Sequence, residues 1–184
     1  LDEYNGERYH TTVWSQYVMF PQQTGKLSIP NIKFEGVYVT QNPNIDPIDA
    51  FFNGGSAVIQ QKKTIIAPSV DINVMPLPDK PENFSGAVGD FSIKSVLKTS
   101  NPKENEPLQL QVTISGTGNV DLIKIPTVNF PSEFETYEPK QQTNSQLTAK
   151  GMNGSMVIDY VAVPNQKGQF TIPAIDFVYF DTST

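Results

Sequence analysis

The sequence predicts an all-β protein of tandem immunoglobulin-like β-sandwich domains, the first of which is truncated at its N-terminus. Three observations lead to this prediction: a long internal repeat, strands in which apolar and polar residues alternate, and frequent turn residues. The 184 residues include 15 prolines and 12 glycines without a fixed period, which indicates many turns and excludes a collagen-like chain. Apolar residues make up 38% of the chain, enough for small packed cores.

The internal repeat consists of two stretches that align without a gap. Tyr17–Phe34 aligns with Tyr160–Phe177, and Tyr, Val, Pro, Gln, Gly, Ile, Pro, Ile and Phe recur in register. Each copy is predicted to be a strand, a Pro/Gly turn and a second strand. In both copies the apolar alternation slips by one residue, at Pro30 and at Pro173, which indicates a bulge or bend on an edge strand because proline cannot donate to a ladder. The repeat therefore predicts two domains of one architecture.

Residues 82–184 are expected to form a complete sandwich domain. Leu108–Ser115 alternates apolar and polar residues without a slip, as a strand with one buried face does. Asn153-Gly154 predicts a tight hairpin turn. About seven strands in roughly a hundred residues are typical of an immunoglobulin-like sandwich. The expected strands are Phe91–Lys98, Leu108–Ser115, Leu122–Ile125, Phe134–Tyr137, Gln146–Lys150, Met156–Val163 and Gln169–Phe180.

Residues 1–75 are interpreted as the C-terminal part of a similar domain. Because few residues precede the first repeat copy, we expect the opening strands to be missing and the chain to be a piece of a longer protein. Asp46 as cap and Pro47 at the first position predict a short helix that ends at Gly54. Residues 76–81 contain three prolines and are predicted to form a stiff linker that favours one domain orientation. The other strands expected in this part are Val37–Thr40, Ser56–Gln60, Lys63–Ala67 and Val70–Val74.

Charge and composition argue against several classes of partner and chemistry. The net charge of −6, without a basic cluster, argues against nucleic acid and against direct binding of anionic lipids. The absence of cysteine removes disulfides, thiolate catalysis and thiolate-zinc sites. No apolar run approaches the roughly 18 residues of a membrane-spanning helix. We therefore expect any membrane anchor to lie outside this chain.

The sequence predicts no catalytic, cofactor-binding or metal-binding residue. His10 is the one histidine, so a catalytic triad or a histidine-metal site lacks partners. Ser56 follows two glycines, but the nucleophile elbow requires G-x-S-x-G between a strand and a helix. The glycine-rich stretch Gly116–Asn119 has no helix after it, so it is interpreted as a turn at the end of a strand and not as a phosphate-binding loop.

Two groups of oxygen-bearing side chains could form a site, and both are interpreted structurally: Asn42, Asn44, Asp46 and Asp49 are the first group, and Glu133, Glu135 and Glu138 the second. The first only faintly resembles a calcium loop, because prolines interrupt it and no glycine and bidentate glutamate follow; turn and cap chemistry explains it better. The second could be imagined as a glycosidase carboxylate pair, although a solvated strand edge is the simpler interpretation.

Trp14, the sole tryptophan, has two interpretations. Facing outward beside Tyr9 or Tyr38, it would offer a platform on which a sugar ring could stack. A tryptophan on a sandwich strand belongs more often to the core, and we predict a core position here.

Several motifs resemble those of a known family. Residues 76–91 resemble the PLP…KP..F.GAVG.F signature of the BatD (oxygen-tolerance) family of bacterial envelope proteins. The stretch Ile114–Asn119, the Ile125-Pro126 step and Phe134–Pro139 resemble that family's G.GN, P and FE.Y.P positions. The resemblance spans nearly the whole chain and is carried most specifically by the GAVG block.

The resemblance implies an exported, membrane-anchored bacterial protein with tandem immunoglobulin-like domains on the periplasmic face of the inner membrane. It implies von Willebrand A-type Bat membrane proteins as partners, a MoxR-type ATPase as an indirect partner, and a role in aerotolerance or envelope-stress survival. It supplies no catalytic residue and no cofactor. We therefore expect a non-enzymatic protein-interaction or scaffold module. The alternatives are a carbohydrate-binding or adhesin-type module and, less favoured, an enzyme that uses carboxylates.

Overall fold

The computed structural model describes residues 1–53, 57–149 and 151–183, and among these residues the regular secondary structure is almost entirely β-strand. The all-β fold class predicted from the sequence is confirmed. The chain divides into two units, one of residues 21–76 and the other of residues 1–20 with 77–184. The domain boundaries predicted from the sequence, 1–75, 76–81 and 82–184, stay a prediction.

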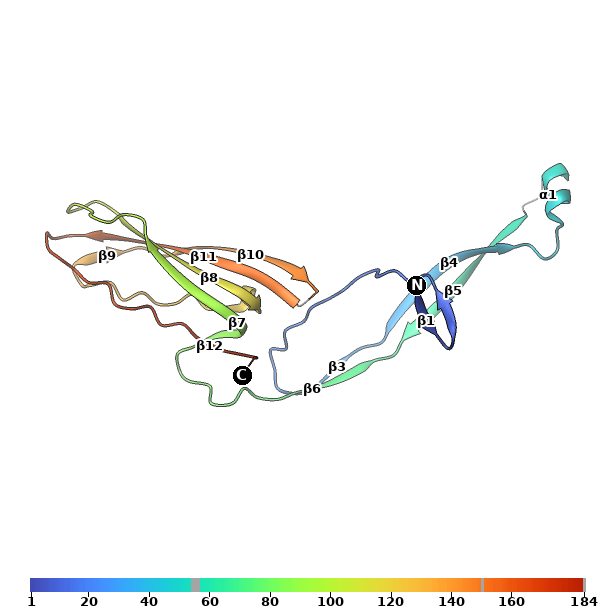
Figure 1. The fold of residues 1–184 in the computed structure, drawn as a ribbon, viewed down its shortest axis with the longest axis horizontal. Coiled ribbons are helices and arrows are strands. Elements are labelled where there is room, and N and C mark those ends of the chain that lie inside the picture. Colours follow the sequence, from blue (N-terminus) through green and yellow to red (C-terminus); the bar gives the residue numbers. More distant parts are fainter. Residues whose placement is uncertain (54–56, 150, 184) are drawn as a thin grey trace. The chain divides into compact units, whose positions relative to one another are not determined.

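The larger unit contains a six-stranded sheet (Figure 1). Its order is β10-β11-β8-β7-β12, and β9 pairs with the end of β11. The pairs β10–β11, β11–β8 and β8–β7 are antiparallel, whereas β12 pairs with β7 in parallel. The strands are β7 (Phe84–Leu97), β8 (Leu108–Gly118), β9 (Phe134–Thr136), β10 (Lys140–Thr148), β11 (Gly151–Pro164) and β12 (Val178–Phe180).

The core lies against one face of this sheet because apolar residues alternate along its two central strands. Along β8 and β11 every second side chain is buried, and the residues between them are polar or partly exposed. Partly buried residues of the segments 125–134 and 172–179 pack against this face, so extended chain and β12 form the second layer. The buried strand residues are Leu108, Leu110, Val112, Ile114, Met156, Ile158, Tyr160 and Ala162. The layers match the predicted immunoglobulin-like sandwich.

Three local predictions in this unit are wrong. Asn153-Gly154 lies inside β11, because Thr148 pairs with Gly151 and the chain therefore turns earlier. The expected strand Leu122–Ile125 is replaced by the 3-10 helix η1 (Val120–Leu122) and irregular chain. The expected strand Gln169–Phe180 is regular only in β12, since Pro173 removes a donor from the middle of the stretch.

The smaller unit consists of two antiparallel strand pairs and one helix. β3 (Gly25–Ile29) pairs with β6 (Val70–Val74), and β4 (Ile32–Gln41) pairs with β5 (Val58–Ala67). The two strands expected at 56–60 and 63–67 are one strand, β5. None of the described residues of this unit is buried, because no second layer packs on the ribbons. Within the described residues this unit is therefore a set of open ribbons and not two packed sheets.

The predicted helix forms as α1 (Pro47–Asn53). The side-chain Oδ1 of Asp46 accepts a hydrogen bond of 2.8 Å from the backbone N–H of Ile48, as an N-cap residue does. Gly54, the predicted end of the helix, and Ser56 lie outside the described residues. A further hairpin, β1 (Asp2–Tyr4) and β2 (Glu7–Tyr9), was not predicted, although its turn is an Asn-Gly dipeptide.

The two repeat copies do not adopt the same hairpin. Tyr160–Pro164 lies in β11, whereas Tyr17–Phe20 is irregular. Conversely, Gly25–Ile29 forms β3, whereas the corresponding residues of the second copy are irregular. The prediction of identical hairpins is therefore wrong. Strand β11 receives its hydrogen bonds from β8, β9 and β10, and no ladder is formed by Tyr17–Phe20 in the described structure.

Candidate functional site

The family-like glycine motifs meet where β7 bends. The first residues of β7 pair with β12 and the later ones with β8, so the strand changes direction between them (Figure 1). Gly86 and Gly89 allow the bend with φ of +83° and +146°. Gly89 lies opposite Gly118, and an added Cβ on Gly118 would approach the carbonyl oxygen of Val88 to 2.3 Å. Glycine is therefore required here for close backbone approach.

Asn119 fastens this bend through its side chain. Its Oδ1 accepts a 2.7 Å hydrogen bond from the backbone N–H of Val88, and its Nδ2 donates a 2.8 Å bond to the carbonyl oxygen of Gly86. The residue is only 7% exposed, so both bonds are sheltered from water. The amide thus bonds the backbone of β7 at the point where the pairing of β7 passes from β12 to β8. The prediction of a turn over Gly116–Asn119 is wrong in detail, because β8 continues to Gly118.

Ser85 joins the start of β7 to the C-terminal strand. Its Oγ donates a 2.6 Å hydrogen bond to the carbonyl oxygen of Val178 and accepts one of 3.2 Å from the backbone N–H of Ala87. The backbone N–H of Lys124 donates to the carbonyl oxygen of Ser85 at 2.9 Å. The GAVG and G.GN motifs therefore serve the architecture of the bend, and their polar groups bond one another.

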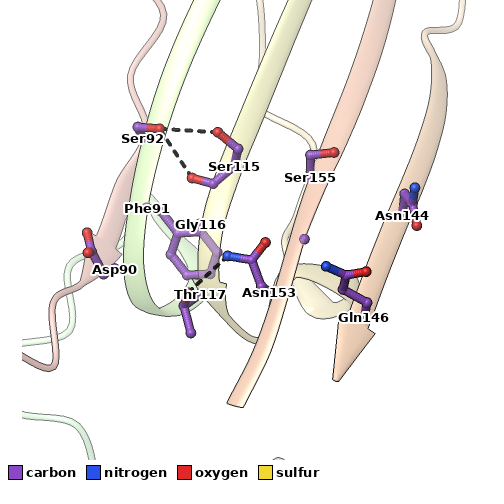
Figure 2. Close-up of a pocket in the computed structure, with 11 residues that line it drawn as sticks. Asp90, Phe91, Ser92, Ser115, Gly116, Thr117, Asn144, Gln146, Asn153 and Ser155 are labelled. Carbon is purple, nitrogen blue, oxygen red and sulfur yellow. Dashed lines mark hydrogen bonds between the residues drawn. The ribbon is translucent and has the colours of Figure 1, made fainter. Parts of the chain in front are cut away.

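A polar hollow of about 640 Å³ lies on the face of the sheet opposite the core. Figure 2 shows Ser92, Ser115, Ser155 and Asn144 side by side across four strands, as the strand registers require. The Ser92 hydroxyl lies 3.2 Å from both the Oγ and the carbonyl oxygen of Ser115. Hydroxyl and amide groups of this kind can hydrogen-bond a polar ligand. They include no imidazole or amine to act as a general base.

Carboxylates do not converge in either of the two hollows found. The polar hollow contains Asp90, and a second hollow of about 1240 Å³, beside the segment 166–175, contains Glu104. Glu135 accepts a hydrogen bond from Tyr137 and thereby raises the pKa of that phenol. Within the described residues, no three His, Cys, Asp or Glu side chains gather as metal ligands would. Among the same residues no helix is both long and apolar enough to cross a bilayer.

The loop that contains Asn42, Asn44, Asp46 and Asp49 shows the turn and cap chemistry predicted for it. The backbone N–H of Asn44 donates to Oδ1 of Asn42 at 3.1 Å, and Asp46 caps α1. His10 is exposed.

The prediction that Trp14 belongs to the core is wrong, since its side chain is 89% exposed. It lies in the irregular segment 10–20, where Tyr17 is 80% exposed. Tyr9 is also exposed, and its hydroxyl donates to Glu7 at 2.6 Å. No strand ladder forms at Trp14, which explains why a rule for sandwich strands does not apply to it.

A second exposed apolar surface, which the sequence analysis does not predict, lies on the β4–β5 ribbon. Ile32 pairs with Ala67 and Phe34 with Ile65, so the four side chains share one face of the ribbon. We call these four residues the ribbon patch. Ile32, Phe34 and Ile65 are each about half exposed. The signal is present in the sequence as apolar residues at alternate positions, Ile32 and Phe34 on β4 and Ile65 and Ala67 on β5.

The comparisons with known proteins bear on the larger unit. The family model of the BatD DUF11 like domain matches residues 95–184. No curated protein and no solved structure matches the chain. The matched stretch contains the end of β7, all of β8 to β12, and Asn119, whereas its partners Gly86 and Val88 precede the stretch. Residues 95–184 therefore match the BatD family model, which agrees with the family that the sequence motifs resemble.

Proposed function

We propose that this chain is a non-enzymatic protein-interaction module of a BatD-like envelope protein and that the ribbon patch is its principal contact surface. The family match supports an envelope protein without catalytic function. The observation that carries the proposal is the exposure of Ile32, Phe34 and Ile65 on a ribbon that no other layer covers. A two-stranded ribbon is marginally stable by itself, so packing against a partner would stabilise it.

The partner class follows from the family and from the chemistry of the patch. The BatD resemblance points to von Willebrand A-type membrane proteins, with a MoxR-type ATPase as a further, indirect partner, in aerotolerance or envelope-stress survival. Exposed apolar side chains are typical of the centre of a protein interface. Lys33 and Glu35 alternate with the patch residues along β4 and form an exposed ion pair of 2.6 Å on the opposite face of the ribbon. The site of action would be the periplasmic face of the inner membrane, with the anchor outside this chain.

Site-specific photocrosslinking in intact cells tests this function. A photoreactive phenylalanine analogue at Phe34 is expected to crosslink a von Willebrand A-type membrane protein. The same analogue at Gln109, exposed on β8 in the other unit, is the matched control and is expected to give no such product. Recovery of no von Willebrand A-type protein from the Phe34 position, with expression and export intact, would refute the proposal.

A carbohydrate-binding or adhesin-type module is the second candidate, and the exposed aromatic rings of Trp14 and Tyr17 favour it. Aromatic faces stack on sugar rings, and the polar hollow supplies hydroxyl and amide groups. Trp14 emission, titrated with soluble fragments of bacterial envelope glycans, distinguishes the two candidates. A saturable change in Trp14 emission, together with a heat of binding in calorimetry that Trp14→Ala abolishes, would support carbohydrate binding. If the glycan fragments produce neither heat nor a change in emission, the carbohydrate-binding candidate is rejected.

A further inference from the structure

The polar hollow is built from two rows of side chains that cross the sheet from β7 to β10 (Figure 2). The strand register sets each row across the strands, and both rows lie on the face opposite the core. The first row is Ser92, Ser115, Ser155 and Asn144, and the second is Asp90, Thr117, Asn153 and Gln146. Each of these side chains ends in a hydroxyl, an amide or a carboxylate, so hydrogen-bonding groups cover the hollow across four strands.

The hollow differs in charge from the rest of the same sheet face. Among the described residues that line it, Asp90 is the one charged side chain. The next two rows along the strands contain Lys94, Asp159 and Lys140, as expected of a solvated sheet face. Solvation alone therefore does not account for an uncharged patch of hydroxyl and amide groups within this face.

Several polar groups of the hollow are available to a ligand. The amides of Asn144 and Gln146 and the hydroxyl of Ser155 form no hydrogen bond to another described residue. Asn144 and Gln146 are exposed on the edge strand β10, and each amide offers two donor hydrogens and an acceptor oxygen. The core beneath β8 and β11 fixes the backbone that holds the two rows, so the groups are in place before a ligand arrives.

The chemistry of the hollow selects its occupant. An apolar layer, from this chain or from another, would bury the hydroxyl and amide groups without partners, which costs free energy. An anion would meet the Asp90 carboxylate, and no Lys or Arg is among the described residues of the lining. An uncharged polyhydroxyl ligand is complementary, because each of its hydroxyls can donate and accept. Neighbouring strands are about 4.8 Å apart, a repeat similar to that of successive rings in an extended glycan chain.

We propose that the polar hollow binds a linear, uncharged oligosaccharide that lies across β7, β8, β11 and β10. The Asp90 carboxylate accepts hydrogen bonds from sugar hydroxyls on β7, and the amides of Asn144 and Gln146 bond the sugar on β10. The inference goes beyond the proposed interaction module and does not rest on it, because the ribbon patch belongs to the other unit. It also gives carbohydrate binding a site that does not require Trp14.

Calorimetric titration of the full chain, with nuclear magnetic resonance of its backbone amides, tests the site. The neutral probes are cellotriose and triacetylchitotriose, which are linear and uncharged. The anionic probe is trigalacturonic acid. We expect saturable binding of at least one neutral probe, with the largest amide shifts around Ser115 and Ser155, and no binding of the anionic probe.

Two variants and a matched control test the residues of the hollow. Gln146→Ala is expected to weaken binding of the neutral probe about two- to tenfold, the loss that one hydrogen bond brings. Gln142→Ala is the control, because Gln142 lies on the same strand and the same face but outside the lining, and it is expected to bind as the unmodified chain does. Ser155→Leu fills the floor of the hollow and is expected to abolish binding, with thermal unfolding as the check that the sheet still forms.

Three results would overturn the proposal: no saturable binding of either neutral probe, equal binding of the anionic probe, or equal binding by Gln146→Ala and Gln142→Ala together with undiminished binding by folded Ser155→Leu. Binding that Trp14→Ala abolishes and Ser155→Leu leaves intact would assign the sugar to the exposed aromatic rings and would also overturn it. The proposed function is tested separately by crosslinking from Phe34. Failure of one experiment therefore leaves the other result intact.

Discussion

Replacement of Asn119 by alanine tests whether the family-like motifs build the fold. The change removes the acceptor for the Val88 N–H and the donor to the Gly86 carbonyl oxygen, at 2.7 Å and 2.8 Å. Each backbone group left unsatisfied in a buried position costs about 1–3 kcal/mol, so the loss of both bonds is expected to lower the unfolding free energy by about 2–6 kcal/mol. For a domain of about a hundred residues this lowers the melting temperature by more than about 10 °C.

The assay is thermal and urea unfolding followed by far-ultraviolet circular dichroism. Asn119→Asp keeps an acceptor for Val88 and loses the donor to Gly86, and its buried charge has no partner; it is expected to be destabilised as well. Asn153→Ala is the matched control, because Asn153 is exposed and its 3.2 Å bond goes to the Thr117 hydroxyl; its expected effect is below about 0.5 kcal/mol. Equal stability of Asn119→Ala and Asn153→Ala would refute the reasoning.

Three further predictions concern glycine, tyrosine and the ribbon patch. Gly118→Ala is expected to lower the unfolding free energy by more than about 3 kcal/mol, because its Cβ would meet the Val88 carbonyl oxygen at 2.3 Å. Gly36→Ala is the control, since a Cβ at Gly36 would meet no heavy atom within 4 Å, and it is expected to change stability by less than about 0.5 kcal/mol. Similar urea midpoints for the two variants would contradict this prediction. Burial raises the pKa of Tyr160 to about 12, above its unfolded value, so the unfolded chain loses its proton first and stability falls as pH rises from 10 to 12. The loss is at most about 2 kcal/mol and should be absent from Tyr160→Phe; parallel pH profiles of the two proteins would exclude this role. Phe34→Ser is expected to leave the unfolding of the larger unit unchanged, because Phe34 is 47% exposed, and to reduce crosslinking from a photoreactive analogue at Ile65; undiminished crosslinking would argue against the ribbon patch.

The sequence predicts correctly those elements that depend only on residues adjacent in the chain. Leu108–Ser115 alternates without interruption, and β8 covers it and continues to Gly118. Val70–Val74 and the Asp46 cap were predicted for the same reason, since local residues decide them. The bend in β7 could not be predicted, because it depends on a side chain of Asn119 that bonds backbone groups about thirty residues away in sequence.

The errors arose where tertiary neighbours decide the outcome. Asn153-Gly154 carries a turn signal, yet both residues pair on two sides within β11, and an added Cβ on Gly154 would meet Val120 at 2.7 Å. Glycine is favoured there by packing and not by a turn. A core position is predicted for Trp14 because a tryptophan on a sandwich strand is more often buried, whereas burial also requires a neighbouring strand. The ribbon patch was missed for the same reason.

Amide hydrogen exchange of the isolated chain tests the central claim most directly, namely that the six-stranded sheet of the larger unit packs a buried core while the β4–β5 ribbon and the segment 10–20 present an exposed apolar surface. The account predicts slow exchange in β8 and β11 and fast exchange in the segment 10–20 and in β4 and β5. Slow exchange throughout β4 and β5 in the isolated monomer would contradict it.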